Sequence, residues 1–244
     1  MPGKAQKSLP AFAATDVPIP RVKPAVPASG PTAKPNAAPS NSVRSAASEE
    51  IKPTQVRPVY DAEQFDQSVH ALLERNVDFD ELPAQVAKPP CGVTRPLRVT
   101  ELSNRVKVAG KPTLNCATVL ALDKWVTSGV QAAASTHFEK EIEAINISTS
   151  HQCRRRNNSG KGKFSEHAFG NGIDVMSFTT VDGALHPVQS HANGEAAAAK
   201  FQAKSRSSAC EYFTTVLGSG SNDAHANHCH LDLAIRRGGY RLCE

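Results

Sequence analysis

The sequence lacks the long apolar runs and the abundance of aromatic residues that would place it in several common protein classes. Aromatic residues make up 5% of its 244 residues, which argues against a protein that stacks aromatic rings on nucleic-acid bases. It contains no stretch of about 18 apolar residues, so no transmembrane segment is predicted. The opening segment, MPGKAQKSLPAFAATDVP, has no continuous apolar run of about 7 to 15 residues, so no signal peptide is predicted there.

Proline is unevenly distributed, with 11 of the 17 prolines in the first sixty residues. That segment contains a single phenylalanine, Phe12, so it cannot bury enough apolar surface to offset the entropy cost of ordering the chain. We therefore predict a disordered, basic, Pro- and Ala-rich arm over residues 1–60. One folded domain is expected over residues 61–244.

The net charge of +5 is carried by the predicted arm. Residues 1–60 contain eight Lys and Arg against three Asp and Glu, while residues 61–244 contain twenty of each class. A basic arm on a neutral domain favours loose contact with an anionic surface, although a solvated spacer without a partner has the same composition. A nucleic-acid partner would need basic residues clustered on the folded part, so none is predicted.

Six cysteines, all in the predicted domain, include no CxxC pair. Scattered cysteines of this kind favour disulfides formed in an oxidising compartment over a zinc ribbon. Among the fifteen complete pairings of six cysteines, we favour one that contains a Cys153–Cys210 disulfide. The disulfide interpretation conflicts with the lack of a visible signal peptide. Either an export signal is missing from the given start, or the cysteines are mostly reduced and buried.

The apolar pattern from residue 61 onward predicts an α+β domain with a mainly antiparallel sheet and flanking helices. Apolar residues at helical spacing predict a first helix over residues 61–76. Asn115 is expected to cap a second helix, and Trp125 is expected in the core. The other expected elements are a long helix over residues 194–218 that ends at Gly218, and strands over residues 91–102, 142–151, 172–180 and 228–235.

Near the C-terminal end, two histidines alternate with other residues along the last predicted strand. Successive side chains of a strand point to opposite faces, so His228, His230 and Asp232 are expected on one face. Cys229 and Leu231 are expected on the other face. Cys229 is therefore predicted to be a buried or free thiol and not a metal ligand.

A second cluster occurs about fifty residues earlier in the segment FSEHAFGNGID, where glycines permit a tight turn between His167 and Asp174. Neutral imidazole and carboxylate are good zinc ligands, and three protein ligands that leave a fourth position open are typical of catalytic zinc sites. His167, Asp174 and one histidine of the pair His228 and His230 would supply that set. Each cluster alone also occurs by chance, so the prediction depends on both being present.

The two clusters resemble the motifs of the LAS metallopeptidases, the group that contains lysostaphin-type endopeptidases, D-Ala-D-Ala carboxypeptidases and the hedgehog signalling domain. Their pattern S-x-H-x-x-G-x-A-x-D falls on Ser165, His167, Gly170, Gly172 and Asp174, with glycine replacing alanine at position 172. More closely, the stretch from Cys91 to Cys243 resembles the extensin-like C-terminal domain of bacterial envelope proteins. The segments that carry this resemblance are CGVTRPLRV, TLNCATVLALDKW, CRRRNN, SEHAFGNGIDV, ACEYFTTVLG, HANHCHLDLA and GGYRLC. The sequence departs from the family pattern at Cys229, which lies between the two histidines where an aromatic residue is usual.

The resemblance implies a single LAS-type domain that binds one zinc ion. It also implies that the domain hydrolyses amide bonds in the stem-peptide crosslinks of peptidoglycan, in the periplasm or cell envelope. His167, Asp174 and His230 correspond to the zinc ligands. His228 corresponds to a general base or a stabiliser of the tetrahedral oxyanion, and His225 is a second candidate for that work.

Two alternatives stay open on the sequence alone. Arg154, in the segment CRRRNN, corresponds to the arginine with which such enzymes hold substrate or oxyanion, or it is an exposed member of an Arg triplet. The domain itself is expected to be a peptidase, and the alternative is a zinc-bearing binding or structural module of the cell wall that has lost hydrolysis. Retention of His228, which is not needed to bind the metal, favours the enzyme.

Overall fold

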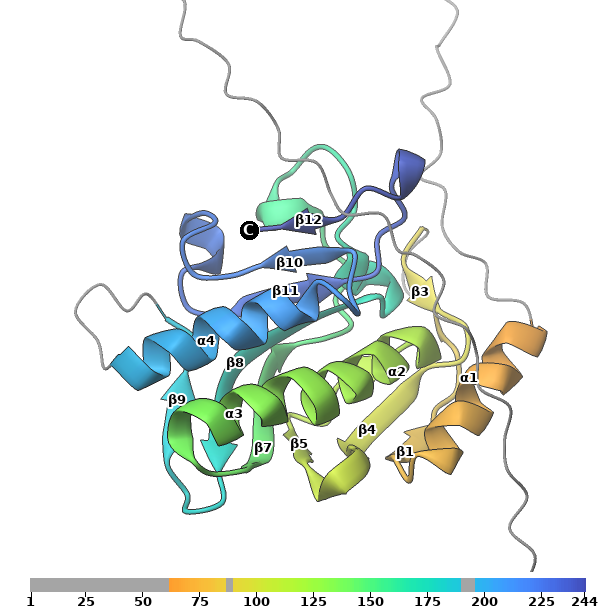
Figure 1. The fold of residues 1–244 in the computed structure, drawn as a ribbon. Coiled ribbons are helices and arrows are strands. Elements are labelled where there is room, and N and C mark those ends of the chain that lie inside the picture. The colour runs from red at the N-terminus through yellow and green to blue at the C-terminus, as the bar shows by residue number, and fades with distance from the viewer. Residues whose placement is uncertain (1–61, 87–89, 190–195) are drawn as a thin grey trace, which may run out of the picture. The chain divides into compact units, whose positions relative to one another are not determined.

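The structure, a computed structural model, describes residues 62–86, 90–189 and 196–244. The arm predicted over residues 1–60 lies outside the described residues. The described part has the predicted α+β class, with helices packed against a large mixed β-sheet (Figure 1). None of the helices in this part is long and apolar enough to cross a membrane.

The helices and strands have the following bounds. Helix α1 spans Ala62–Glu74, α2 Cys116–Lys124, α3 Gln131–Phe138 and α4 Ala196–Ala209, and a π-helical segment over Trp125–Val130 joins α2 to α3. The first six strands are β1 (Asp78–Glu81), β2 (Gln85–Val86), β3 (Gly92–Val93), β4 (Leu97–Glu101), β5 (Lys107–Ala109) and β6 (Thr113–Leu114). The other strands are β7 (Ile142–Thr149), β8 (Gly172–Thr180), β9 (Leu185–Pro187), β10 (Thr215–Leu217), β11 (Cys229–Asp232) and β12 (Leu242–Cys243).

The main sheet has the strand order β1-β4-β5-β7-β8-β11-β10-β12, with β6 paired to β4 and β9 paired to β8. Strands β2 and β3 form a separate pair. Neighbouring strands are antiparallel except for β5 with β7 and β10 with β12. The prediction of a mainly antiparallel sheet is therefore confirmed. All four residues of β11 are buried, so this strand is a central element of the fold.

Trp125 occupies the centre of the core, where α2, α3 and α4 lie across one face of the sheet (Figure 1). Its ring meets the rings of Phe178 and Phe213 edge-on, at centroid distances of 6.0 and 6.2 Å. Its Nε1–H donates a hydrogen bond of 2.9 Å to the carbonyl oxygen of Ser205 in α4, which satisfies the polar end of the buried indole. Trp125 thus joins the π-helical segment to α4 and to the sheet, as predicted for a core residue.

The second helix begins at Asn115, as predicted. The Asn115 side-chain oxygen accepts a hydrogen bond of 2.8 Å from the backbone N–H of Thr118, which caps α2. The Asn115 backbone N–H donates to the carbonyl oxygen of Gly170 at 2.9 Å, and its side-chain amide donates to Asn171 at 3.2 Å. The start of α2 is therefore tied to the loop between the two predicted ligands His167 and Asp174.

Three predicted elements differ from the observed ones by more than two residues at one end. The helix predicted over residues 194–218 ends at Ala209, and Thr215–Leu217 forms β10 between β11 and β12. Pairing on both sides satisfies the backbone of this β-branched segment, so tertiary contacts override helix propensity there. The strand predicted over residues 91–102 splits at a bend before Pro96 into β3 and β4, which belong to different sheets. The strand predicted over residues 228–235 is shorter, and β12 follows it in the chain.

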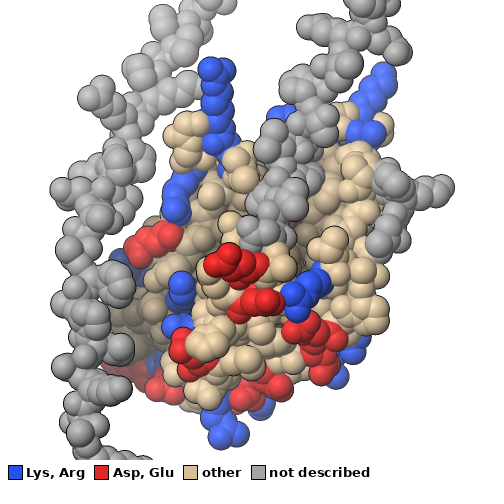
Figure 2. All heavy atoms as spheres, turned by 90° about the vertical axis from the view of Figure 1, so that its right-hand side faces the viewer, with Lys and Arg blue, Asp and Glu red and all other residues tan. Residues whose placement is uncertain are grey.

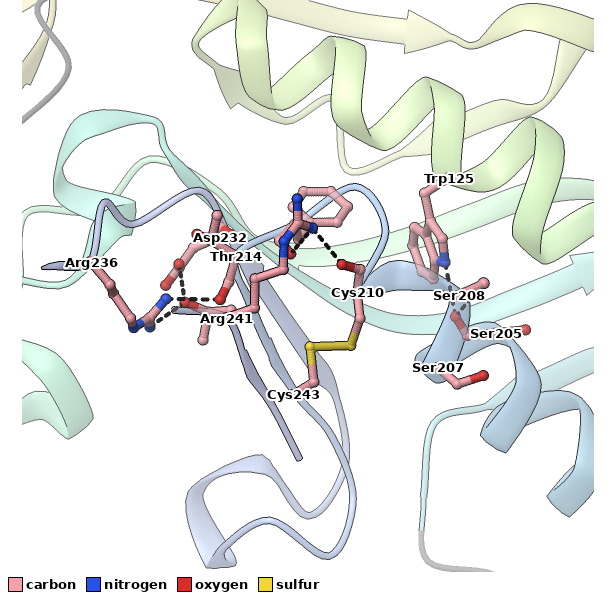
Figure 3. The surroundings of a disulfide bond; sticks show 12 residues. Trp125, Ser205, Ser207, Ser208, Cys210, Thr214, Asp232, Arg236, Arg241 and Cys243 are labelled. Atoms are coloured by element: carbon pink, nitrogen blue, oxygen red, sulfur yellow. Dashed lines mark hydrogen bonds between the residues drawn. A yellow bond between two sulfur atoms is a disulfide. The ribbon is translucent and has the colours of Figure 1, made fainter. Parts of the chain in front are cut away.

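The cysteines form two disulfides, Cys91–Cys153 and Cys210–Cys243, so the predicted Cys153–Cys210 pair is wrong. Cys210 follows α4 and meets Cys243 because β12 pairs with β10 at the end of the sheet (Figure 3). This neighbourhood depends on the pairing of β10 with β12, which the spacing of cysteines in the sequence does not reveal. Cys116 and Cys229 are buried free thiols, which confirms the prediction for Cys229.

Candidate metal centre

Strands β8 and β11 bring the two predicted ligand segments together. They are antiparallel neighbours, and Asp174 lies directly opposite His230 in their ladder. Because directly opposite residues point to the same face of a sheet, the Asp174 carboxylate and the His230 imidazole meet. The adjacent pair in the ladder, Val175 and Cys229, belongs to the apolar core on the other face.

His167 reaches the same point from a short 3₁₀ helix, η4, that spans Glu166–Phe169. Gly170 ends this helix with a φ of 63°, a conformation that disfavours a residue with a Cβ atom. A Cβ atom at Gly170 would also lie 2.9 Å from Val93 Cγ2 and 3.0 Å from the backbone nitrogen of Asn115. The turn between the predicted ligands therefore requires glycine at this position.

Three ligand atoms converge at the centre. His167 Nε2 lies 3.1 Å from Asp174 Oδ1 and 3.1 Å from His230 Nδ1, and the last two atoms are 2.9 Å apart. All three residues are buried. Tetrahedral zinc with bonds of about 2.0–2.1 Å would hold its ligand atoms roughly 3.3 Å apart, so the observed triangle is close to the size that a zinc ion needs.

The outer nitrogen of each ligand imidazole has its own acceptor. His167 Nδ1 lies 2.7 Å from the carbonyl oxygen of Ser150, and His230 Nε2 lies 2.9 Å from Asp232 Oδ2. When the two imidazoles are neutral, as metal ligands must be, these acceptors would hold their protons on the outer nitrogens, so that lone pairs face inward. Two lone pairs and a carboxylate oxygen then point at one another, an arrangement that a bound cation stabilises. The donor set therefore fits a metal ion.

The charges of the two buried ligands are strongly coupled. Burial raises the pKa of Asp174, but hydrogen bonds to His167 and His230 lower it by a larger amount, so its pKa lies well below the usual value. Burial lowers the pKa of His230, but hydrogen bonds to Asp174 and Asp232 raise it to about 9. The Asp174 carboxylate thus stays ionised, and a proton or a cation between Asp174 Oδ1 and His230 Nδ1 is stabilised.

Asp232 contacts the candidate ligand His230, although the sequence interpretation assigned Asp232 no role. It is buried, and beside its contact with His230 its Oδ1 accepts hydrogen bonds from the Thr215 hydroxyl and, at 3.0 Å, from the backbone N–H of Ala234. Burial raises the pKa of Asp232, but the hydrogen bond to His230 lowers it, with a net decrease. A carboxylate that orients a ligand imidazole from behind is a common feature of metal sites. The His-x-Asp alternation was the signal in the sequence.

His228 lies one residue before β11 and on the same side as His230. Its Nε2 atom is 3.8 Å from Asp174 Oδ1, while its Nδ1 atom is 3.1 Å from the side-chain oxygen of Asn227. Burial lowers the pKa of His228 below its ordinary value. The imidazole is therefore neutral at pH 7 and able to accept a proton beside the ligand set.

His225 belongs to a short 3₁₀ helix, Asp223–His225, just ahead of the H-x-H strand. Its Nδ1 atom lies 2.7 Å from the side-chain oxygen of Asn222, and its ring centroid lies 5.2 Å from that of His228 and 5.7 Å from that of His230. Burial, followed by the charges of His230 and His228, lowers the pKa of His225 to about 4. A second neutral imidazole thus stands beside the first.

Arg154 reaches the centre from the segment that precedes η4. Its Nη2 atom lies 3.8 Å from Asp174 Oδ2, and its Nε–H donates to Gln152 Oε1 at 2.9 Å. Arg154, Asp174, His225, His228 and His230 all line one cleft with a volume of about 290 Å³. The structure therefore brings all six predicted site residues together, with His167 fully buried behind the cleft.

Comparison with models of known families identifies the domain. The model of the extensin-like protein C-terminus matches residues 66–244. The chain belongs to this family. No curated protein and no solved structure was found to match the chain. Since the family match includes β8, β11 and the segments between them, the whole candidate metal centre is part of the extensin-like domain.

Proposed function

We propose that this extensin-like domain is a zinc-dependent peptidase of the LAS type that hydrolyses amide bonds in the stem-peptide crosslinks of peptidoglycan. The observation that carries the proposal is the convergence of His167 Nε2, Asp174 Oδ1 and His230 Nδ1 within 3.1 Å of one another at a cleft. Two imidazoles and one carboxylate with an open side are typical of catalytic zinc sites.

These three residues would hold the zinc ion. When bound, zinc would polarise the scissile carbonyl and lower the pKa of an attacking water towards about 7. Ser150 and Asp232 accept at the outer nitrogens and would favour the tautomers of the ligand imidazoles that present lone pairs inward. Because these outer hydrogen bonds are already made, the ligands need little rearrangement to bind the ion.

His228 is proposed as the general base, or as the donor that stabilises the tetrahedral oxyanion. It is neutral near pH 7 and lines the cleft next to Asp174 without being one of the three ligands. His225 is the second candidate, because Asn222 orients its ring and its low pKa keeps it neutral. Either imidazole would take the proton of the attacking water at its Nε2 atom and return it to the leaving amine.

Arg154 is proposed to hold a carboxylate or the developing oxyanion of the substrate. Its guanidinium lies at the edge of the ligand set and is partly exposed to the cleft. Stem peptides carry free carboxylates, which a guanidinium can bind through two parallel hydrogen bonds. Fixing one carboxylate in this way would position the scissile amide beside the centre.

Peptidoglycan as the substrate, and the periplasm or cell envelope as the location, rest on the family resemblance. The two disulfides agree with an oxidising compartment outside the cytoplasm. Loose contact between the basic N-terminal arm and an anionic wall polymer is part of the same proposal.

Defined crosslinked dimers test this function directly. Zinc-loaded full-length protein is incubated with 4,3- and 3,3-crosslinked stem-peptide dimers and with intact sacculi, with and without a chelator, and products are identified by mass. We expect cleavage that the chelator abolishes. His228→Ala should lower turnover by about two to four orders of magnitude. If every dimer and the sacculi stay uncut over a range of pH, the protein is instead a zinc-bearing binding or structural module.

A further inference from the structure

Three arginines line the cleft beside the candidate metal centre. Two of them face carboxylates, since Arg154 Nη2 lies 3.8 Å from Asp174 and Arg156 Nη2 lies 3.7 Å from Glu166. Among the described residues, the third arginine, Arg236, makes no ion pair with a carboxylate. Arg236 is thus a cation in the cleft wall whose charge no side chain of the described part directly offsets.

Arg236 is nevertheless held in a fixed position. One terminal nitrogen donates to the carbonyl oxygen of Thr214 at 2.8 Å, and the other donates to the Thr215 hydroxyl at 2.6 Å (Figure 3). A guanidinium has five N–H donors, so three remain for another acceptor. The Asp232 carboxylate makes no direct contact with Arg236, because its Oδ1 accepts from the same Thr215 hydroxyl that Arg236 binds and its Oδ2 contacts His230.

The strand order separates Arg236 from Arg154. Arg154 lies against Asp174 on β8, whereas Arg236 lies against Thr215 on β10, and β11 with His230 runs between these strands. Strands two positions apart are separated by about 10 Å, which an extended peptide covers in roughly three residues. The two guanidinium groups therefore contact strands on either side of β11, which carries His230.

The segments that carry these arginines are basic. Residues 153–165, CRRRNNSGKGKFS, contain five Lys and Arg and no Asp or Glu, and residues 233–241, LAIRRGGYR, contain three and none. On the face that carries α1 and β1, in contrast, acidic and basic side chains are interspersed (Figure 2). The two arginine-bearing segments, which both contribute residues to the cleft, are therefore locally basic although the domain as a whole is neutral, and a local excess of positive charge attracts anionic ligands.

We propose that Arg236 forms a second carboxylate site, so that the substrate carries one carboxylate on each side of the scissile amide. Arg154 would bind the first carboxylate and Arg236 the second, with the candidate metal centre between them. This inference rests on the proposed function, since the scissile amide is defined by the peptidase activity. It narrows the substrate class to peptides that carry a carboxylate on each side of the scissile amide.

A cycle of protein and ligand changes tests the second site. The ligands are a synthetic crosslinked stem-peptide dimer and two analogues, each with one carboxylate replaced by a carboxamide. Binding is measured by calorimetry with zinc-loaded full-length protein carrying His228→Ala, which slows turnover. We expect one analogue to bind about 10- to 100-fold more weakly than the dimer. In the Arg236→Gln protein, the affinities for the dimer and for this analogue should differ by less than about threefold, because the carboxylate no longer has an arginine to bind.

The other analogue supplies an internal control. Its weaker binding should persist in the Arg236→Gln protein and disappear with Arg154→Gln. Arg237→Gln is the matched control, since Arg237 is exposed and does not line the cleft, and it should leave both losses unchanged. If Arg236→Gln leaves both losses unchanged as well, the second site is wrong.

Zinc content and thermal unfolding are measured for each variant. If Arg236→Gln binds less zinc or is less stable, Arg236→Lys is used in its place. In that variant the difference in affinity between the dimer and the Arg236-sensitive carboxamide analogue should become smaller, while the affinity for the analogue itself stays constant. An unchanged loss in that variant also overturns the proposal. If the dimers stay uncut but each loss of affinity disappears with its arginine as expected, the peptidase proposal is wrong and the two carboxylate sites stand. If the dimers are cleaved but the losses of affinity do not depend on Arg236, the peptidase stands and the second carboxylate site is wrong.

Discussion

The two faces of the β8–β11 ladder share one backbone and serve different purposes. On one face, Ile173 pairs with Leu231 and Val175 with Cys229, and all four side chains are buried in the apolar core. On the other face, the cross-strand pair of Asp174 and His230 forms the candidate metal centre with His167. Because side chains alternate along a strand, the residues that stabilise the sheet also fix the direction in which the ligands point.

A β-bulge adjusts this alternation next to the centre. In the pairing of β7 with β8, Ile147 lies opposite Val175, while the preceding residue Asn146 lies opposite Ser177, so Met176 is an extra residue on β8. Val175 and Phe178 both pack in the core, although strict alternation would place them on opposite faces. The bulge therefore lets Asp174 face the centre while the rest of β8 keeps its apolar contacts.

The largest expected effect is loss of metal from the polar face. His230→Ala and Asp174→Ala each remove one of three ligand atoms, so zinc bound after dialysis should fall from about one ion per chain to a small fraction. Metal content is measured by atomic spectroscopy after thermal unfolding has shown that the variant is folded. His228→Ala is the matched control and should retain most of the zinc. Equal loss in that control would show that the ligand assignment is wrong.

A change on the apolar face should act on stability and leave metal binding intact. Leu231 is fully buried, so Leu231→Ala should lower the free energy of unfolding by about 2–5 kcal/mol. The measurement is chemical denaturation with intact disulfides, and zinc affinity is then determined where the variant is fully folded. If Leu231→Ala weakens zinc binding as much as a ligand change does, the two faces are not separable.

Asp232→Asn should weaken zinc binding without abolishing it. The variant keeps the side-chain size but removes the charge that orients His230 from behind, a change that typically costs 10- to 100-fold in metal affinity. Competition with a coloured chelator gives the affinity. Thr215→Ser keeps the hydroxyl that binds Asp232 and serves as the control with nearly unchanged affinity. An unaltered affinity in Asp232→Asn would reduce Asp232 to a structural role.

The smallest effect is expected from the cysteine of the apolar face. Burial raises the pKa of Cys229 to about 12 and raises that of Cys116 as well, so neither thiol should react with a thiol reagent at pH 8 in the native protein. Unfolding without a reductant should expose both thiols, while the two disulfides stay closed. Rapid reaction of a thiol in the zinc-loaded native state would show that this face opens to solvent.

Features that depend on residues close together in the chain were predicted correctly, whereas features that depend on strand pairing were not. The cap of α2 at Asn115 and the alternation around His230 depend on neighbours within a few residues, so the sequence predicted them correctly. The end of α4 at Ala209 and the Cys210–Cys243 disulfide depend on β10 pairing with β11 and β12. β10 and β12 are short strands that the sequence pattern did not predict, so their pairing could not be inferred from it.

By itself, the sequence determined which residues are able to act as ligands and which of them share a strand face, because residue chemistry and strand alternation are local properties. Only the tertiary structure decided that Asp174 lies opposite His230, that Asp232 orients His230, and that Arg236 faces the cleft without a carboxylate partner among the described residues. Each of these depends on the register between strands, which is set by packing of the whole core and not by any one segment.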